Sequence, residues 1–140
     1  MGAQIRAGDV VRVPYATFAE APIHERDLAG FGARALLTDE LVSRRSMLTG
    51  LQSHTHEEMV ATIGDVIGRP LRYQEIRPEA AKHGMVQHGF PEPFAEALLA
   101  RYARGVGQPA PFTGEVEKIL GRPARSYAEW VADHAAAFGK

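Results

Sequence analysis

The residues THEEMVATIGDVIGRPLRYQEI, at positions 55–76, decide the fold class of this 140-residue chain. Thr55 and Glu58 have the spacing of a capping box, in which the threonine caps a helix and the glutamate reaches back to the cap. Apolar residues recur on one side of the helix that follows: Met59, Val60, Ile63, Val66 and Ile67. Gly68 is placed to end that helix, and the alternating residues 71–76 indicate a half-exposed strand. A helix that leads directly into a strand predicts an α/β fold.

The residues before this stretch add further strands and one more helix. A β-rich run at Val10–Val13 ends at a proline, which is typical of a strand end. Asp27 is expected to be the N-cap or a first-turn acid of a helix that runs to about Leu37. Residues 46–49 are expected to form another strand, closed by Gly50. Residues 1–70 thus form the sheet-bearing portion of a single expected domain.

The residues after it are expected to be mostly helical, as a second portion of the same domain at 71–140. A short helix is predicted from Pro78 to about Gly84, and a longer one between residues 91 and 104. Thr113 is a candidate cap for a short helix before Gly121. A second capping box, at residues 126–129, begins the last helix.

Composition narrows the possible partners. Hydrophobic residues make up 45% of the chain and charged residues 24%, as in a folded globular protein. The net charge of −1 gives no electrostatic reason to bind nucleic acid or an anionic membrane. There is no cysteine, which excludes disulfides and thiolate metal sites and fits a reducing cytoplasm. No apolar run approaches the roughly 20 residues of a membrane helix.

Several segments together resemble the C-terminal half of NmrA-like proteins, which are atypical short-chain dehydrogenase/reductases and are similar to nucleotide-sugar epimerases. The matching segments are residues 9–15, 21–29, 47–50, 55–73 and 122–130. The resemblance implies a partial Rossmann-like sheet with a helical substrate-binding subdomain at the C-terminus. Full members of that family are about twice as long as this chain, and the difference lies at the N-terminus.

The features that bind the cofactor in that family are not found here. A Rossmann domain holds a dinucleotide at a glycine-rich turn between a strand and a helix. A formal match at residues 30–35 falls inside the helix expected after Asp27. The family's tyrosine–lysine pair is also absent, because Ala19, Arg77, Val106 and Val131 stand four residues after the four tyrosines. We therefore expect no cofactor to be bound by this chain alone, and NAD(P) only if a partner supplies the nucleotide site.

The candidate site residues follow from their chemistry and from the resemblance. His24 lies between a strand end and two acids, beside the substrate cleft of the family, and is the candidate catalytic acid–base group. The candidate substrate-binding residues are Arg12, Tyr15, His83, Met85, His88, Phe90 and Tyr102. A metal site at residues 54–58 is not favoured, because the capping box already explains that segment.

Three functions remain open on the sequence alone. The first is the substrate-binding half of an NmrA-like NAD(P)-dependent oxidoreductase or epimerase. The second is a regulatory sensor module without turnover, and the third is a cofactor-free isomerase or cyclase that uses His24. The expected ligand is a small apolar organic molecule. Because a partial sheet would leave an open strand edge, we expect a homodimer or a hetero-complex with a nucleotide-binding subunit.

Overall fold

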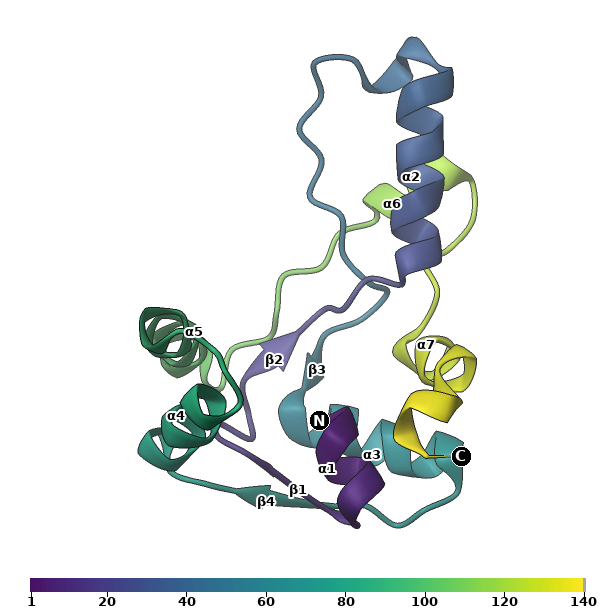
Figure 1. Ribbon diagram of the computed structural model, residues 1–140. Helices are drawn as coiled ribbons and strands as arrows, with labels where there is room; N and C mark the ends of the chain where they lie inside the picture. Colours follow the sequence, from purple (N-terminus) through teal and green to yellow (C-terminus); the bar gives the residue numbers. More distant parts are fainter. Residues whose placement is uncertain (140) are drawn as a thin grey trace.

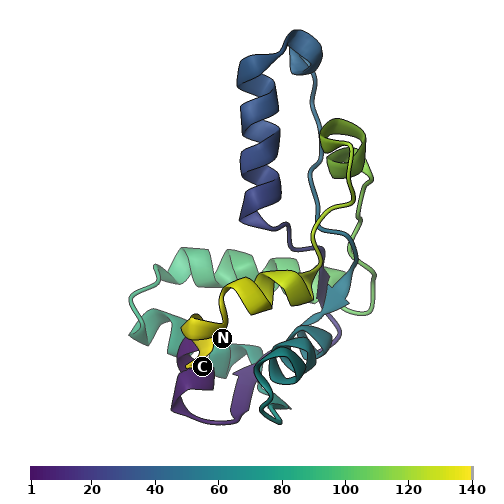
Figure 2. The ribbon, with the colours of Figure 1, turned by 90° about the vertical axis from the view of Figure 1, so that its right-hand side faces the viewer.

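The computed structural model describes residues 1–139 as a helical body from which a long arm rises (Figure 1). The body holds a small parallel sheet covered by helices, and Figure 2 shows the arm standing above it. The elements of the body are α1 (Gly2–Ala7), β1 (Val10–Val13), α3 (His56–Ile67), β4 (Arg72–Glu75), α4 (Pro78–Gln87), α5 (Glu92–Gly105), α7 (Tyr127–Asp133) and the 3-10 helix η2 (Ala135–Phe138). The α/β prediction is confirmed, and the short helix α1 was not predicted.

The core of the body lies where α1, α3 and α7 meet β1. Its side chains are almost completely shielded from solvent: Ile5, Val11, Val60, Ile63, Ile67, Val131 and Phe138. Most of the apolar positions expected on one side of the helix at 55–67 are therefore buried, with Val66 packed at the edge of the cluster. Residues from both ends of the chain meet in this core, so that the N-terminal and C-terminal elements stabilise each other.

The helix α3 begins and ends as its sequence predicts. The Thr55 hydroxyl accepts a hydrogen bond from the backbone N–H of Glu58 at 3.1 Å. The Glu58 carboxylate accepts one from the Thr55 N–H at 2.8 Å, which completes the capping box. Gly68 follows in the left-handed region with a φ of 69°, where a side chain would be strained. The equivalent capping box at Ser126 also forms.

The predicted strands at 10–13 and 71–76 are confirmed as β1 and β4, which pair in parallel with Val10 opposite Arg72. The predicted strand at 46–49 is wrong. This segment is extended, but it has no ladder partner among residues 1–139. It is held instead by single hydrogen bonds to loops, such as that from the Gly50 N–H to the Ala21 carbonyl. A strand needs a neighbouring strand, and the described residues supply none here.

The arm consists of α2 (Glu25–Leu37), the 3-10 helix η1 (Asp39–Leu41), the extended segment 42–50 and α6 (Glu115–Leu120). The predicted end of α2 at Leu37 is confirmed. His24, not Asp27, is the N-cap: its Nδ1 accepts a hydrogen bond from the backbone N–H of Arg26. Asp27 lies in the first turn, which was the alternative. The arm contacts the body at its base (Figure 1).

The helices α4 and α5 form an antiparallel pair beside β4 (Figure 1). The predicted end of α4 near Gly84 is wrong, because the helix continues to Gln87. Isolated glycines are tolerated inside helices, and this one has nothing within contact distance of the missing Cβ. Lys82 joins the two helices through Glu92 and Glu96, at 2.7 and 2.6 Å. Within residues 1–139 no helix is both long and apolar enough to cross a membrane.

Candidate functional site

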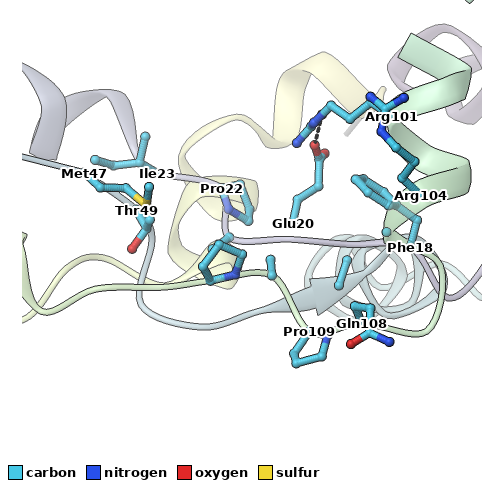
Figure 3. Close-up of a pocket in the computed structure, with 15 residues that line it drawn as sticks. Phe18, Glu20, Pro22, Ile23, Met47, Thr49, Arg101, Arg104, Gln108 and Pro109 are labelled. Atoms are coloured by element: carbon cyan, nitrogen blue, oxygen red, sulfur yellow. Dashed lines mark hydrogen bonds and ion pairs between the residues drawn. The ribbon is translucent and has the colours of Figure 1, made fainter. Parts of the chain in front are cut away.

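A cavity of about 750 Å³ lies where the arm meets the body (Figure 3). Its walls come from three extended segments, 18–23, 47–49 and 108–111, and from the C-terminal end of α5. The first segment contains the short strand β2 (Ala19–Glu20), which pairs antiparallel with β3 (His54–Thr55). The cavity is thus built from parts of the chain that lie far apart in sequence.

Hydrogen bonds hold these segments in place. The Thr113 N–H donates to the buried Thr49 hydroxyl at 2.8 Å, and the Thr113 hydroxyl donates to the Met47 carbonyl at 2.6 Å. The Ala110 N–H donates to the Ser53 hydroxyl at 2.8 Å. These bonds substitute for a regular sheet ladder, because side-chain hydroxyls satisfy backbone groups that a neighbouring strand would otherwise pair. The segment at residues 47–53 is therefore fixed to the segment at residues 109–113, and each of the two contributes to the cavity wall.

Three of the lining side chains are charged. The Arg101 guanidinium lies 2.9 Å from the Glu20 carboxylate and 5.3 Å from the centre of the Phe18 ring. Both contacts restrict the arginine side chain, through an ion pair and a cation–π interaction. Arg104, one turn later on α5, lines the same cavity (Figure 3).

An aromatic cluster supports the cavity behind Phe18. The ring of Phe18 packs against Tyr102 and His56, with centroids 4.5 and 5.2 Å apart. Tyr15 meets the edge of Tyr102 at 6.5 Å and has a positive φ of 60°, which is uncommon for a bulky residue. Burial, and next the charge of Glu20, raise the pKa of Tyr102, so its phenol stays protonated at neutral pH.

The structure brings together only two of the residues expected to bind substrate. Tyr15 and Tyr102 both lie in the aromatic cluster next to the cavity. Arg12 is on β1, where its backbone N–H donates to the Gln4 side chain at 2.7 Å. It does not line the cavity.

The other four lie on or just after α4. His83 contacts Gln87 at 2.9 Å, and His88 bonds the Gly84 carbonyl at 2.7 Å. Phe90 stacks on Phe94 at 5.8 Å. None of these residues, and not Met85 either, lines the cavity.

His24 is buried at the N-terminus of α2. Its Nε2 lies 3.4 Å from the Asp133 carboxylate, and its ring has no exposed side-chain surface. His24 does not line the cavity, although the residue before it, Ile23, does. Its contacts are those of a helix cap that joins α2 to α7. The acid–base role of His24 stays a prediction.

None of the site residues predicted from the sequence lines the cavity. One signal in the sequence could have indicated part of the cavity wall. Two arginines stand at the end of a helix that a glycine terminates, and the proline-rich residues 109–111 follow shortly after. No group of three or more His, Cys, Asp or Glu side chains placed to hold a metal ion occurs among residues 1–139.

Comparison with curated proteins finds reductases. The chain is 35% identical, over 96% of its length, to a (4-alkanoyl-5-oxo-2,5-dihydrofuran-3-yl)methyl phosphate reductase from Streptomyces griseus. It is 38% identical, over 84% of its length, to an NAD(P)H azoreductase from Xenophilus azovorans. These matches cover 48% and 41% of the relatives, so the chain spans about half the length of the curated relatives it matches. No protein-family model matches the chain.

Solved structures show the same fold. An NADPH-dependent quinone oxidoreductase from Escherichia coli matches with a TM-score of 0.78 at 18% identity, covering 96% of this chain and 49% of that one. A nucleoside-diphosphate-sugar epimerase from Staphylococcus aureus matches with a TM-score of 0.75 at 16% identity, covering 94% and 46%. The chain is therefore similar in sequence to about half of each of two reductases, and its fold matches about half of each of the two solved structures.

Proposed function

We propose that the chain is the substrate-binding half of an NAD(P)-dependent oxidoreductase, and that the cavity between the arm and the body is its substrate pocket. The observation that carries this proposal is the cavity itself, in a chain whose relatives are reductases. A concave site with a largely apolar wall and a few polar groups suits a small organic molecule. The chain would bind and orient that molecule and shield it from water.

We propose that the chain does not hold the dinucleotide by itself. Gly30, in the formal glycine match at residues 30–35, lies inside α2 and not in a turn after a strand. A Cβ at Gly30 would lie 3.1 Å from a methyl group of Leu120, so the glycine allows α2 and α6 to pack closely. We therefore propose that polypeptide outside these 140 residues holds the NAD(P)H, which supplies the hydride when bound.

A titration with NADPH and NADH tests this division of roles. The chain alone should give no saturable change in nicotinamide fluorescence with either nucleotide up to the millimolar range. Saturable binding at micromolar nucleotide would contradict the proposal, since the chain would then hold its own cofactor. The intact fold is checked on the same sample by circular dichroism.

The arm supplies a surface for the nucleotide-binding polypeptide. Large apolar side chains on α2 and on the segment after it are exposed: Leu28, Leu36, Leu37, Val42, Met47 and Leu51. Leu36 and Leu37 are 88% and 83% exposed. Exposed large apolar side chains gathered on one part of the fold are typical of an interface, and the backbone of the segment at 46–49 has no ladder partner within residues 1–139. The relatives, about twice as long, contain further chain that would cover it. We propose that the occupant is the nucleotide-binding half.

Dye binding and light scattering test this surface. The chain should bind an apolar-surface dye, and the double substitution Leu36→Glu and Leu37→Glu should remove most of that signal without changing the circular dichroism spectrum. Light scattering should show a monomer for both proteins. A concentration-independent homodimer that protects this surface from the dye would overturn the proposal, because a second copy would then be the occupant.

A further inference from the structure

The charges on the cavity wall are unequal. Arg101 and Arg104 are one turn apart on α5 and therefore lie on the same side of that helix. Both line the cavity, and the only carboxylate among the lining residues is that of Glu20 (Figure 3). Two guanidinium groups against one carboxylate leave the wall with one excess positive charge.

That excess charge is on Arg104. Arg101 already has an acceptor in Glu20, whose side chain is 31% exposed. The C-terminal dipole of α5 favours a cation at Arg104, which is in the last turn. Within residues 1–139, however, no side chain forms an ion pair with Arg104. A guanidinium presents its N–H donors as a planar fork that matches the oxygens of a carboxylate or a phosphate.

The remaining wall is mostly apolar. Its large apolar side chains come from all three extended segments: Phe18, Pro22, Ile23, Met47, Pro109 and Pro111. An apolar body fits beside these side chains, while a charged group fits at the end of α5. The arrangement therefore favours a ligand with both parts.

We propose that this cavity selects an organic substrate that carries an oxyanion, a phosphate or a carboxylate, and that Arg104 binds this group. Arg101 makes a second contact, which the Glu20 carboxylate weakens by competing for the same guanidinium. This inference rests on the proposed function, in which the cavity is the substrate pocket. It adds the class of substrate and names the residue that selects it.

Three probes with the same six-carbon body test the inference on the full chain: hexyl phosphate, hexanoate and hexan-1-ol. Binding is measured by calorimetry, and its place by NMR shifts of backbone amides. The shifts should centre on Ile23, Thr49 and Gly105, which line the cavity. The two anions should bind about tenfold more tightly than the alcohol, and added salt should weaken only the anions. The ratio between phosphate and carboxylate tells which oxyanion the site prefers.

Two substitutions should change this affinity in opposite directions. Arg104→Gln should weaken the anions about tenfold and leave the alcohol unchanged. Glu20→Gln should strengthen the anions by about threefold, since Arg101 is then free to bind them. Partial unfolding would lower the affinity for the anions and could not raise it. A higher anion affinity in Glu20→Gln therefore reports the change in charge and not a change in stability. Arg72→Gln, an exposed arginine on β4 outside the cavity, is the matched control and should change nothing.

The outcomes separate the inference from the proposed function. Equal binding of the alcohol and the anions in the cavity, unaffected by Arg104→Gln, would overturn the inference and leave the pocket in place. Binding of none of the three probes would overturn the inference together with the pocket assignment. Anion binding whose NMR shifts lie away from the cavity would also overturn the inference.

Discussion

Replacing Asp27 by asparagine should lower the free energy of unfolding by about 3 kcal/mol. The Asp27 side chain is completely buried at the base of the arm. It accepts hydrogen bonds from the Arg122 guanidinium and from the Arg125 backbone N–H, both at 2.7 Å, and from the Arg125 guanidinium. Asparagine would leave two arginines beside a neutral amide. This loss in the free energy of unfolding lies at the lower end of the range for breaking a buried ion pair. The reason is that Arg122 and Arg125 are 39% and 29% exposed and can be partly hydrated.

The pH dependence of this variant follows from the pKa of Asp27. Burial alone would raise that pKa, but the hydrogen bonds from Arg125 and Arg122 outweigh burial, and the folded pKa is lowered. A lowered folded pKa gives stability that is present above the unfolded value of about 3.9 and is lost as the pH falls through the folded value. The stability difference between the wild type and Asp27→Asn should therefore be constant from about pH 7 to pH 5 and shrink below about pH 4.

Urea unfolding followed by circular dichroism measures both effects. The control is Glu40→Gln, which breaks the ion pair with Arg34 on the exposed end of the same arm. That pair is about half exposed on both sides, so its loss should cost under about 1 kcal/mol. If Asp27→Asn and Glu40→Gln lowered the free energy of unfolding equally, the buried contacts of Asp27 would stabilise the chain no more than an exposed ion pair does.

The same residue shows what the sequence can and cannot reveal. A first-turn acid was among the roles expected for Asp27, because a helix N-terminus favours negative charge. Its partners lie 95 and 98 residues further along the chain, and no local pattern indicates them. The capping boxes at Thr55 and Ser126 were predictable because all of their contacts lie within four residues.

The cavity was harder to predict for the same reason. Its walls come from segments that separate in sequence by up to about ninety residues, and each segment alone has the composition of an ordinary loop. His83 and His88 were predicted to bind substrate because of their side-chain chemistry. In the structure helix α4 continues past Gly84 to Gln87, and neither histidine lines the cavity. The extended segment at 46–49 was predicted as a strand from its residues, yet a strand also requires a partner.

Replacing Gly50 by alanine should destabilise the chain by about 3 kcal/mol or more, since overpacking against backbone leaves no flexible side chain to give way. A Cβ at this position would lie 2.0 Å from the carbonyl oxygen of Pro22 and 2.8 Å from its carbonyl carbon. The two backbones are held at this approach by the hydrogen bond from the Gly50 N–H to the Ala21 carbonyl, at 3.0 Å. One of the two segments must therefore move, and the hydrogen bond would be lost or stretched.

The effect should extend to the cavity, because Pro22 and Thr49 both line it. In Gly50→Ala, binding of hexyl phosphate and of hexan-1-ol should weaken together, in contrast to Arg104→Gln, which affects the anion alone. The control is Gly84→Ala, in the interior of α4 with nothing within 4 Å of the missing Cβ. There alanine should stabilise the chain by about 0.5–1 kcal/mol through its better helix propensity. Thermal and urea unfolding of both variants measure the contrast, and an unchanged or raised stability of Gly50→Ala would contradict the close packing of residues 21–22 against residue 50.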